Sequence, residues 1–277
     1  MIRRILFPVD FSSSCLATAP FVKRAAAIFG AEVTLVHVCD LSSHNGFELF
    51  ERPATDIARE HWSLALRKLE LFLESDFPPA NSRRVLLSGY AADLIAETAK
   101  NFDLIMMATH AGRFRRLLLG STTAKVLNDT DCPVWTTEHA ETIVPRSLEH
   151  RKWVCAVGLS ADSERVFRYA QHAALVAKSD LSLLHVIESS KVHSEAHGPS
   201  NEVQRARQHI ADLQRRVGSK SPVRIASGPI RETLLDQVRQ AAADVFVIGR
   251  GLHPATERLP DLSYSLVRDS PCPVVSV

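Results

Sequence analysis

Long apolar runs are absent from this 277-residue sequence. No stretch approaches the roughly 18 uninterrupted apolar residues that a membrane span requires. The N-terminal segment MIRRILFPVDF is too short, and with Pro8 too interrupted, to serve as the apolar part of a secretory signal. The sequence therefore predicts a chain with no membrane partner.

An excess of charge of one sign is also missing. Lys and Arg number 33 against 31 for Asp and Glu, which gives a formal net charge of +2, whereas nucleic-acid binders carry a strongly basic footprint. The five cysteines are odd in number, scattered and never spaced as C-x-x-C, the pattern of a zinc site or a redox dithiol. We expect a reduced cytoplasmic protein with no nucleic-acid partner.

Three motifs that mark common enzyme classes are lacking. The sequence contains no G-x-x-x-x-G-K-[ST], no G-x-S-x-G and no G-x-G-x-x-G, so a P-loop, a serine-hydrolase elbow and a dinucleotide fingerprint have no support. His193 and His197 have the i, i+4 spacing of metal ligands, but serines and Gly198-Pro199 around them favour a loop. We assign no metal site and no catalytic residue.

The sequence does contain an internal repeat. Residues 3–40 align with residues 151–188 at a constant offset of 148 without a gap, and the C-terminal parts of the two copies also match. The matching pairs include Arg3 and Arg151, Val9 and Val157, Ser12 and Ser160, His37 and His185, Gly89 and Gly228, Asp103 and Asp244, and Cys132 and Cys272. The chain is thus two copies of one unit.

Within each copy, short apolar runs alternate with helical stripes, a pattern typical of a parallel sheet buried on both faces. The runs of the first copy are 5–9, 33–38, 84–87, 104–108 and 133–137. We predict two tandem α/β domains, each a five-stranded parallel sheet flanked by helices, at residues 1–140 and 151–277. Residues 141–150 form the linker, and the two last strands, apolar and otherwise unpaired, are expected to pack together.

These residues resemble the universal stress proteins in their tandem form. The matching stretches are ILFPVDFS, LVHV, GRFRRLLLGSTTAKVL and DCPV, and the resemblance covers nearly the whole chain. It implies a Rossmann-like (adenine nucleotide alpha hydrolase-like) fold and, in one subfamily, a bound ATP. Mg²⁺ could accompany that nucleotide.

The residues themselves also suggest a nucleotide site. Ligands of open parallel sheets bind beyond the carboxyl ends of the strands, where Asp10 could accept hydrogen bonds from a ribose or a base; alternatively, Asp10 only caps the following helix. Gly120 to Thr122 open a helix whose N-terminus favours phosphate. The expected nucleotide contacts are Pro8, Asp10, Val38, Ala108, His110, Gly112, Arg113, Gly120, Ser121 and Thr122.

Both copies depart from the pattern of ATP-binding members. In the first copy, Ala108 replaces the first glycine of the phosphate loop, and the loop is about one residue short. In the second copy, Gly158 stands where Asp10 stands in the first, and Pro260-Asp261 aligns with Gly120-Ser121. A carboxylate at that helix start would repel phosphate, so we expect at most one ATP per chain, in the N-terminal copy.

Three functions are compatible with these features. The first is a stress-response protein in which ATP or a related adenine nucleotide, bound by the N-terminal domain, stabilises a conformation or an assembly, with a homodimer expected. The second is a slow ATP-hydrolysing enzyme, at most a weak ATPase because no acid-base pair accompanies the phosphate loop. The third is a nucleotide-free dimerisation module. His37 and His185 are expected to be packed or hydrogen-bonded rather than catalytic.

Overall fold

The computed structural model describes residues 1–39, 54–109, 119–137, 148, 150–160, 162–188, 199–250 and 261–277. Its contacts divide the chain into two compact units, Ile2–Cys132 and Pro133–Val277, the second of which also includes Met1. His193 and His197 lie outside the described residues. None of the helices in the described ranges is long and apolar enough to cross a membrane.

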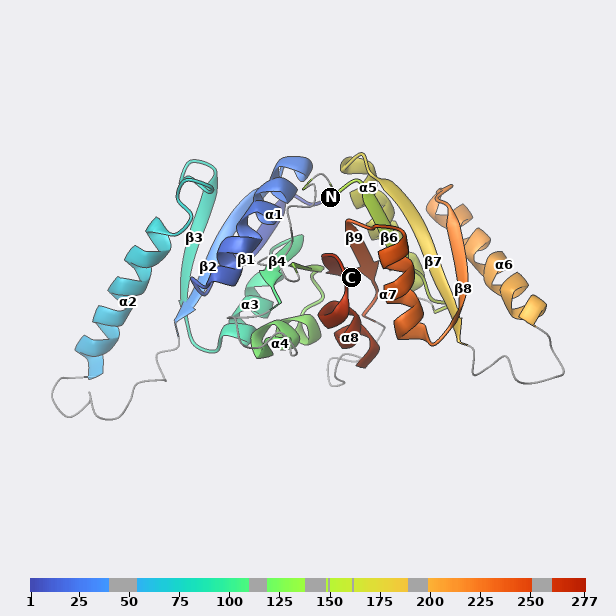
Figure 1. Cartoon of the computed structure of the whole chain (residues 1–277). Coiled ribbons are helices and arrows are strands. Elements are labelled where there is room, and N and C mark those ends of the chain that lie inside the picture. The colour runs from blue at the N-terminus through green and yellow to red at the C-terminus, as the bar shows by residue number, and fades with distance from the viewer. Residues whose placement is uncertain are drawn as a thin grey trace. The chain divides into compact units, whose positions relative to one another are not determined.

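Strands and helices alternate along each copy (Figure 1). The first copy contains β1 (Arg4–Pro8), α1 (Ser13–Phe29), β2 (Glu32–Cys39), α2 (Ala54–Leu71), β3 (Ser82–Ser88), α3 (Ala91–Ala99), β4 (Leu104–Ala108), α4 (Ser121–Asp129) and β5 (Val134–Thr137). The second contains β6 (Lys152–Ala156), α5 (Ser163–Val176), β7 (Asp180–Glu188), α6 (Pro199–Val217), β8 (Val223–Gly228), α7 (Ile230–Gln240), β9 (Val245–Ile248), α8 (Asp261–Asp269) and β10 (Val274–Ser276).

The strand order places a switch point at the same position in both copies. In the first compact unit the parallel order is β3-β2-β1-β4, and in the second it is β8-β7-β6-β9-β10. In each copy the second and third strands therefore lie to one side of the first strand, β1 or β6, and the fourth strand lies on its other side. Right-handed crossovers consequently put the first two helices of a copy on one face and the last two on the other. The packing of α3 on α4 and of α7 on α8 agrees with this arrangement.

The predicted α/β fold with a mostly parallel sheet is confirmed. The second copy has the five parallel strands expected of it, whereas the last strand of the first copy, β5, belongs to the second compact unit. There β5 pairs antiparallel with β10, with Thr136 opposite Val274, and the Thr136 hydroxyl donates to the carbonyl of Val274 over 3.3 Å. The expected packing of the two last strands therefore occurs through backbone pairing.

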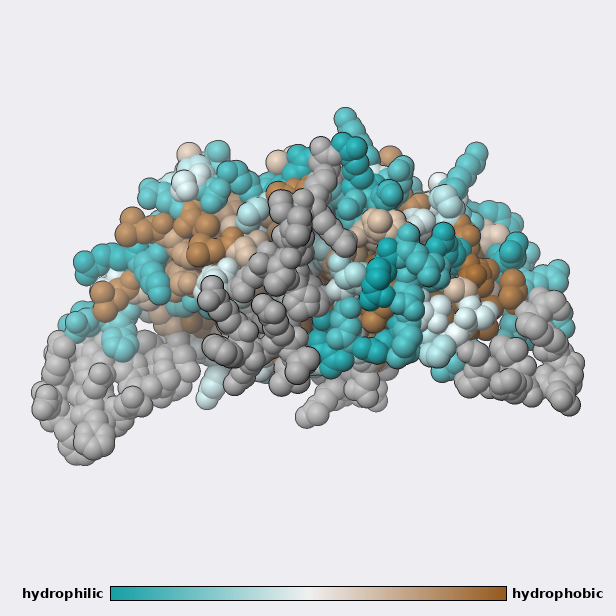
Figure 2. Space-filling model, viewed as in Figure 1, coloured by the Kyte–Doolittle hydropathy of each residue, from teal (hydrophilic) through white to brown (hydrophobic). Residues whose placement is uncertain are grey.

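The central strands are buried because both faces of each sheet are covered. Ile5, Leu6 and Phe7 of β1 are fully buried, as is Val247 of β9, which fits the apolar runs of the sequence. Helix α7 illustrates the covering layer. It buries Leu234, Leu235 and Val238, whereas hydrophilic residues cover its outer side (Figure 2).

Candidate functional site

Asp10 follows β1 at the switch point of the first sheet. Its Oδ1 accepts hydrogen bonds from the backbone N–H of Ser12 and from the thiol of Cys15, each over 3.0 Å. Ser12 is the N-cap residue of α1, because its hydroxyl accepts from the N–H of Cys15. The structure therefore assigns the capping role to Ser12, and Asp10 supports the turn before it. Within the described part of the chain, Oδ2 of Asp10 accepts no hydrogen bond.

Asp10 and its partner Cys15 differ in protonation state at neutral pH. Burial on its own would raise the pKa of Asp10, but the hydrogen bonds from Cys15 and Ser12 outweigh that effect and hold the pKa below its usual value. Burial, together with the neighbouring Asp10 charge, raises the pKa of the Cys15 thiol to about 12. At neutral pH the site therefore contains an ionised carboxylate and a protonated thiol that donates to it.

An aromatic group lies next to Asp10. Phe11 has a φ of +63°, which is unusual for a bulky residue, and its ring centroid lies 4.2 Å from that of His37. The Nζ of Lys68 lies 4.5 Å from the centroid of the same ring, a cation-π contact. The Nδ1 of His37 is 2.7 Å from the carbonyl oxygen of Val9, and burial lowers the pKa of this histidine. The expectation that His37 is hydrogen-bonded is confirmed.

The start of α4 is attached to the end of β4. The hydroxyl of Thr123 donates to the carbonyl of Ala108 over 3.0 Å, and the N–H of Gly120 donates to the carbonyl of Thr109 over 2.9 Å. Because β4 pairs directly with β1, the helix start and Asp10 follow adjacent parallel strands and lie at the same edge of the sheet. This edge is where an open parallel sheet binds its ligand.

The remaining predicted contacts divide into two groups. Pro8 is buried at the end of β1, Val38 is half-buried in β2, and Ser121 and Thr122 form the first turn of α4. His110, Gly112 and Arg113 lie outside the described residues. The structure thus brings the ends of β1, β2 and β4 and the start of α4 to one edge of the sheet.

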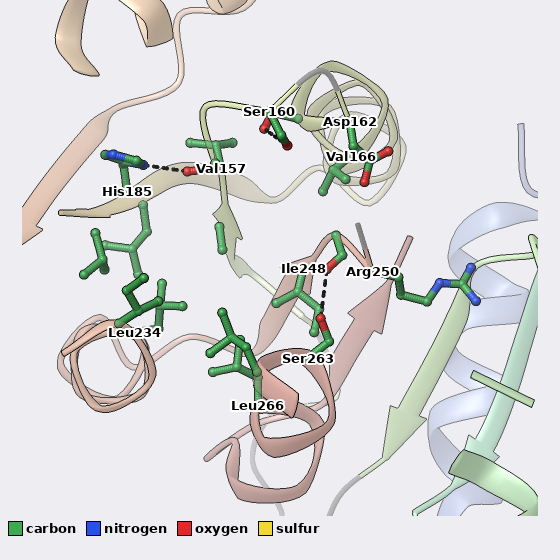
Figure 3. Close-up of a pocket in the computed structure, with 18 residues that line it drawn as sticks. Val157, Ser160, Asp162, Val166, His185, Leu234, Ile248, Arg250, Ser263 and Leu266 are labelled. Atoms are coloured by element: carbon green, nitrogen blue, oxygen red, sulfur yellow. Dashed lines mark hydrogen bonds between the residues drawn. The ribbon is translucent and has the colours of Figure 1, made fainter. Parts of the chain in front are cut away.

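The second copy contains a cavity of about 370 Å³ at the corresponding position (Figure 3). It lies at the ends of β6, β7 and β9 and at the starts of α5, α7 and α8, and much of its wall is aliphatic, with side chains that include Val166, Leu184, Leu234, Ile248 and Leu266. The residue pattern does not predict this cavity. A cavity volume depends on side-chain packing, which no motif encodes.

The framework around the cavity repeats that of the first copy. The Nδ1 of His185 lies 2.8 Å from the carbonyl oxygen of Val157, as His37 does from Val9. Ser263 donates to the carbonyl of Gly249 over 3.3 Å, the counterpart of the bond between Thr123 and Ala108. The expectation for His185 is thereby confirmed as well.

The main difference is the missing carboxylate. A Cβ added at Gly158 would lie 3.5 Å from the Oγ of Ser163 and 3.7 Å from that of Ser160, which are ordinary contacts. Ser163 occupies the repeat position of Cys15, and Ser160 that of Ser12. The second copy therefore retains hydrogen-bond donors at the positions equivalent to Ser12 and Cys15, which bind the carboxylate of Asp10 in the first copy. It lacks only the carboxylate that would accept from them.

Comparison with known proteins identifies relatives of both copies. The model of the universal stress protein family matches residues 1–137 and 149–277. Universal stress protein MJ0531 of Methanocaldococcus jannaschii is 31% identical over 137 residues, which are 48% of this chain and 79% of that protein. A universal stress protein from Archaeoglobus fulgidus superimposes with a TM-score of 0.70 at 21% identity, covering 99% of this chain and 95% of the other. A protein described as functionally unknown, PA1789 from Pseudomonas aeruginosa, superimposes with a TM-score of 0.65 at 17% identity, covering 100% of this chain and 92% of the other.

Proposed function

Because the chain belongs to the universal stress protein family and carries two copies of its domain, we propose that it binds an adenine nucleotide, ATP or a close relative, in the first copy. The nucleotide acts as a ligand that stabilises one conformation or assembly of the protein, and a homodimer is the assembly we expect. Residues 1–140 form the binding domain, and residues 151–277 form a copy that does not take ATP.

The carboxylate of Asp10 is the observation that supports this proposal most directly. It is ionised at neutral pH, it lies at the switch point, and two donors hold its Oδ1 while its Oδ2 accepts from no described residue. A fixed carboxylate with an available oxygen suits the hydroxyls of a ribose or the amino group of a base. If the role of Asp10 were only structural, the hydrogen bonds that its Oδ1 accepts from Ser12 and Cys15 would be sufficient.

The start of α4 supports the phosphate end of the proposal. The positive end of a helix dipole and the unpaired N–H groups of a first turn favour anions; Gly120 is the N-cap of α4, and Ser121 and Thr122 begin its first turn. The bonds from Thr123 and Gly120 to the end of β4 fix the turn in place. We propose Gly112 and Arg113 as further phosphate contacts, with Mg²⁺ accompanying a triphosphate.

Two measurements test the proposed function. Mass spectrometry of the protein as purified should detect a co-purified adenine nucleotide, and calorimetry with Mg²⁺-ATP should give a stoichiometry near one per chain. A charge-assisted hydrogen bond contributes about 1.5 to 3 kcal/mol, so Asp10→Ala should weaken binding by about tenfold or more. Asp236→Ala, which removes a carboxylate from the surface pair with Arg239, is the matched control. Unchanged affinity in a folded Asp10→Ala protein would reject the assignment.

The effect on assembly is measured separately. Light scattering coupled to gel filtration should show a larger population of dimer with Mg²⁺-ATP than without nucleotide. An equal distribution in both conditions, with ATP bound, would contradict the assembly role and leave a conformational role, which hydrogen exchange with and without ATP measures.

A further inference from the structure

The cavity of the second copy combines apolar walls with a buried hydroxyl that has only a weak partner. Ser163 is 4% exposed, and its Oγ lies 3.4 Å from the Oγ of Ser160, well beyond the 2.7 to 2.8 Å typical of hydroxyl pairs. In the first copy the corresponding group is the thiol of Cys15, which is engaged with Asp10. Gly158, which stands at the position of Asp10, has no side chain to bond with Ser163. The hydroxyl of Ser163 therefore retains hydrogen-bonding capacity toward the cavity.

The electrostatics of the cavity disfavour phosphate. Arg250 is the one Lys or Arg among the described lining residues, and its guanidinium points away from the aliphatic walls (Figure 3). The carboxylate of Asp162 is paired with Arg165, whose Nε lies 2.8 Å away. Helix α8 begins at residue 261, and that residue is an aspartate in the sequence, so the first residue of the helix carries a formal negative charge, which opposes the attraction of a helix N-terminus for anions. Two like charges a few ångströms apart repel by about 1 kcal/mol even in water, and by more at lower polarity.

We infer that the second copy is a separate binding site for an uncharged nucleoside or free purine base, and that it selects against the phosphorylated form. Its volume of about 370 Å³ falls at the lower end of the range of about 300 to 1,000 Å³ for small-molecule pockets. The aliphatic walls receive the flat apolar body, and Ser163, with Ser160 beside it, bonds the polar edge of the ligand. The choice of a purine rests on the function proposed for the first copy; the selection against phosphate does not.

Leu262 allows the cavity to be closed with little risk to the fold. Its side chain lines the cavity yet is 36% exposed, so Leu262→Trp places a larger ring at the rim without overpacking the core. Leu175→Trp makes the same substitution at a residue of α5 that is 69% exposed and does not line the cavity. Comparison of these two variants distinguishes the effect of filling the cavity from a general effect of introducing a tryptophan.

Equilibrium dialysis with labelled adenosine tests the inference on the full chain. With Mg²⁺-ATP present at saturation, wild-type protein and Leu175→Trp should each bind about one adenosine. Leu262→Trp should weaken this binding at least about tenfold, and Ser163→Ala by about two- to tenfold, the range for one hydrogen bond. Thermal unfolding of each variant confirms that it is folded.

The outcomes distinguish the two sites. If ATP fails to bind but adenosine binding depends on Leu262 and Ser163, the function proposed for the first copy fails and this inference stands. Displacement of adenosine by ATP from the site that depends on Leu262 would overturn the selection against phosphate. Adenosine binding that is absent, unaffected by both cavity variants, or lost in Asp10→Ala would overturn the second site itself.

Discussion

The thiol of Cys15 donates a hydrogen bond to the Oδ1 of Asp10 across 3.0 Å. This bond joins the first turn of α1 to the loop after β1, and together with the N–H of Ser12 it fixes the orientation of the carboxylate. Cys15 is therefore a positioning residue for the proposed nucleotide site, since it acts on the ligand only through Asp10.

Removal of this thiol should affect both the pKa of Asp10 and the affinity for nucleotide. In Cys15→Ala the carboxylate loses one of its two donors, so the pKa of Asp10 should rise and ATP should bind about two- to tenfold more weakly. Cys15→Ser restores a donor and should restore both properties. Calorimetry measures the affinity, and an NMR titration of the Asp10 carboxyl carbon follows its pKa.

Cys155→Ala is the control for this prediction. It removes a thiol that is fully buried in β6 of the second copy, so it matches the loss of a buried sulfur without touching Asp10. The positioning role is wrong if Cys15→Ala and Cys155→Ala have the same ATP affinity, or if Cys15→Ser binds no better than Cys15→Ala.

Alkaline pH should destabilise the protein through the same thiol. The folded-state pKa of Cys15, about 12, lies above the ordinary value of 9.0, so the unfolded chain loses this proton first as the pH rises. The stability that Cys15 contributes is complete below about pH 9 and is lost between pH 9 and 12. At pH 10.5 the loss from this one group is about 2 kcal/mol.

Urea unfolding at pH 8 and at pH 10.5 measures this effect. Cys15→Ser has no thiol to ionise, so its free energy of unfolding should fall less between the two pH values than that of the wild type. Equal decreases in the free energy of unfolding of the two proteins would show that the pKa of the Cys15 thiol does not differ between the folded and unfolded states as described. Cys155, whose pKa burial also raises to about 12, remains present in both proteins.

The attachment of α4 to β4 gives a third prediction. Thr123→Val keeps the shape of the side chain and removes the bond to the carbonyl of Ala108, which should cost about 1 kcal/mol of stability and weaken ATP binding. Ser263→Ala removes the corresponding bond to Gly249 and should lower stability without changing ATP affinity. Chemical unfolding and calorimetry on the two variants measure the difference, and equal effects on ATP binding would contradict the assignment of phosphate to the first copy.

Asymmetry between the copies gives the fourth prediction. The wild-type chain should bind one ATP, whereas a variant with Gly158→Asp, Pro260→Gly and Asp261→Ser should approach two. The new carboxylate at position 158 has room for its Cβ and has Ser163 beside it as a donor, and the other two changes remove the repulsion and restore an N–H group at the start of α8. Titration calorimetry measures the stoichiometry. A wild-type value near two would contradict the asymmetry directly.

The sequence predicts the fold well because the repeat and the alternation of apolar runs depend only on local patterns. It also places Asp10 and the start of α4 at one edge of a sheet, since parallel strands align their carboxyl ends. It does not predict that Cys15 donates to Asp10, that the ring of Phe11 contacts His37, or that Ser12 rather than Asp10 caps α1. These contacts depend on rotamers and on the left-handed backbone at Phe11, and neither can be read from residue types and their spacing.

The pairing of β5 with β10 means that the repeat in the sequence and the compact unit of the structure end at different residues. A chain cut at residues 141–150 would leave β5 on one fragment and β10 on the other, each with an exposed backbone edge. Such fragments should aggregate or recombine with each other rather than behave as two independent proteins. The linker predicted at residues 141–150 is therefore the cleavage point we propose for a split version of this protein, in which restored β5–β10 pairing would report that the fragments have reassembled.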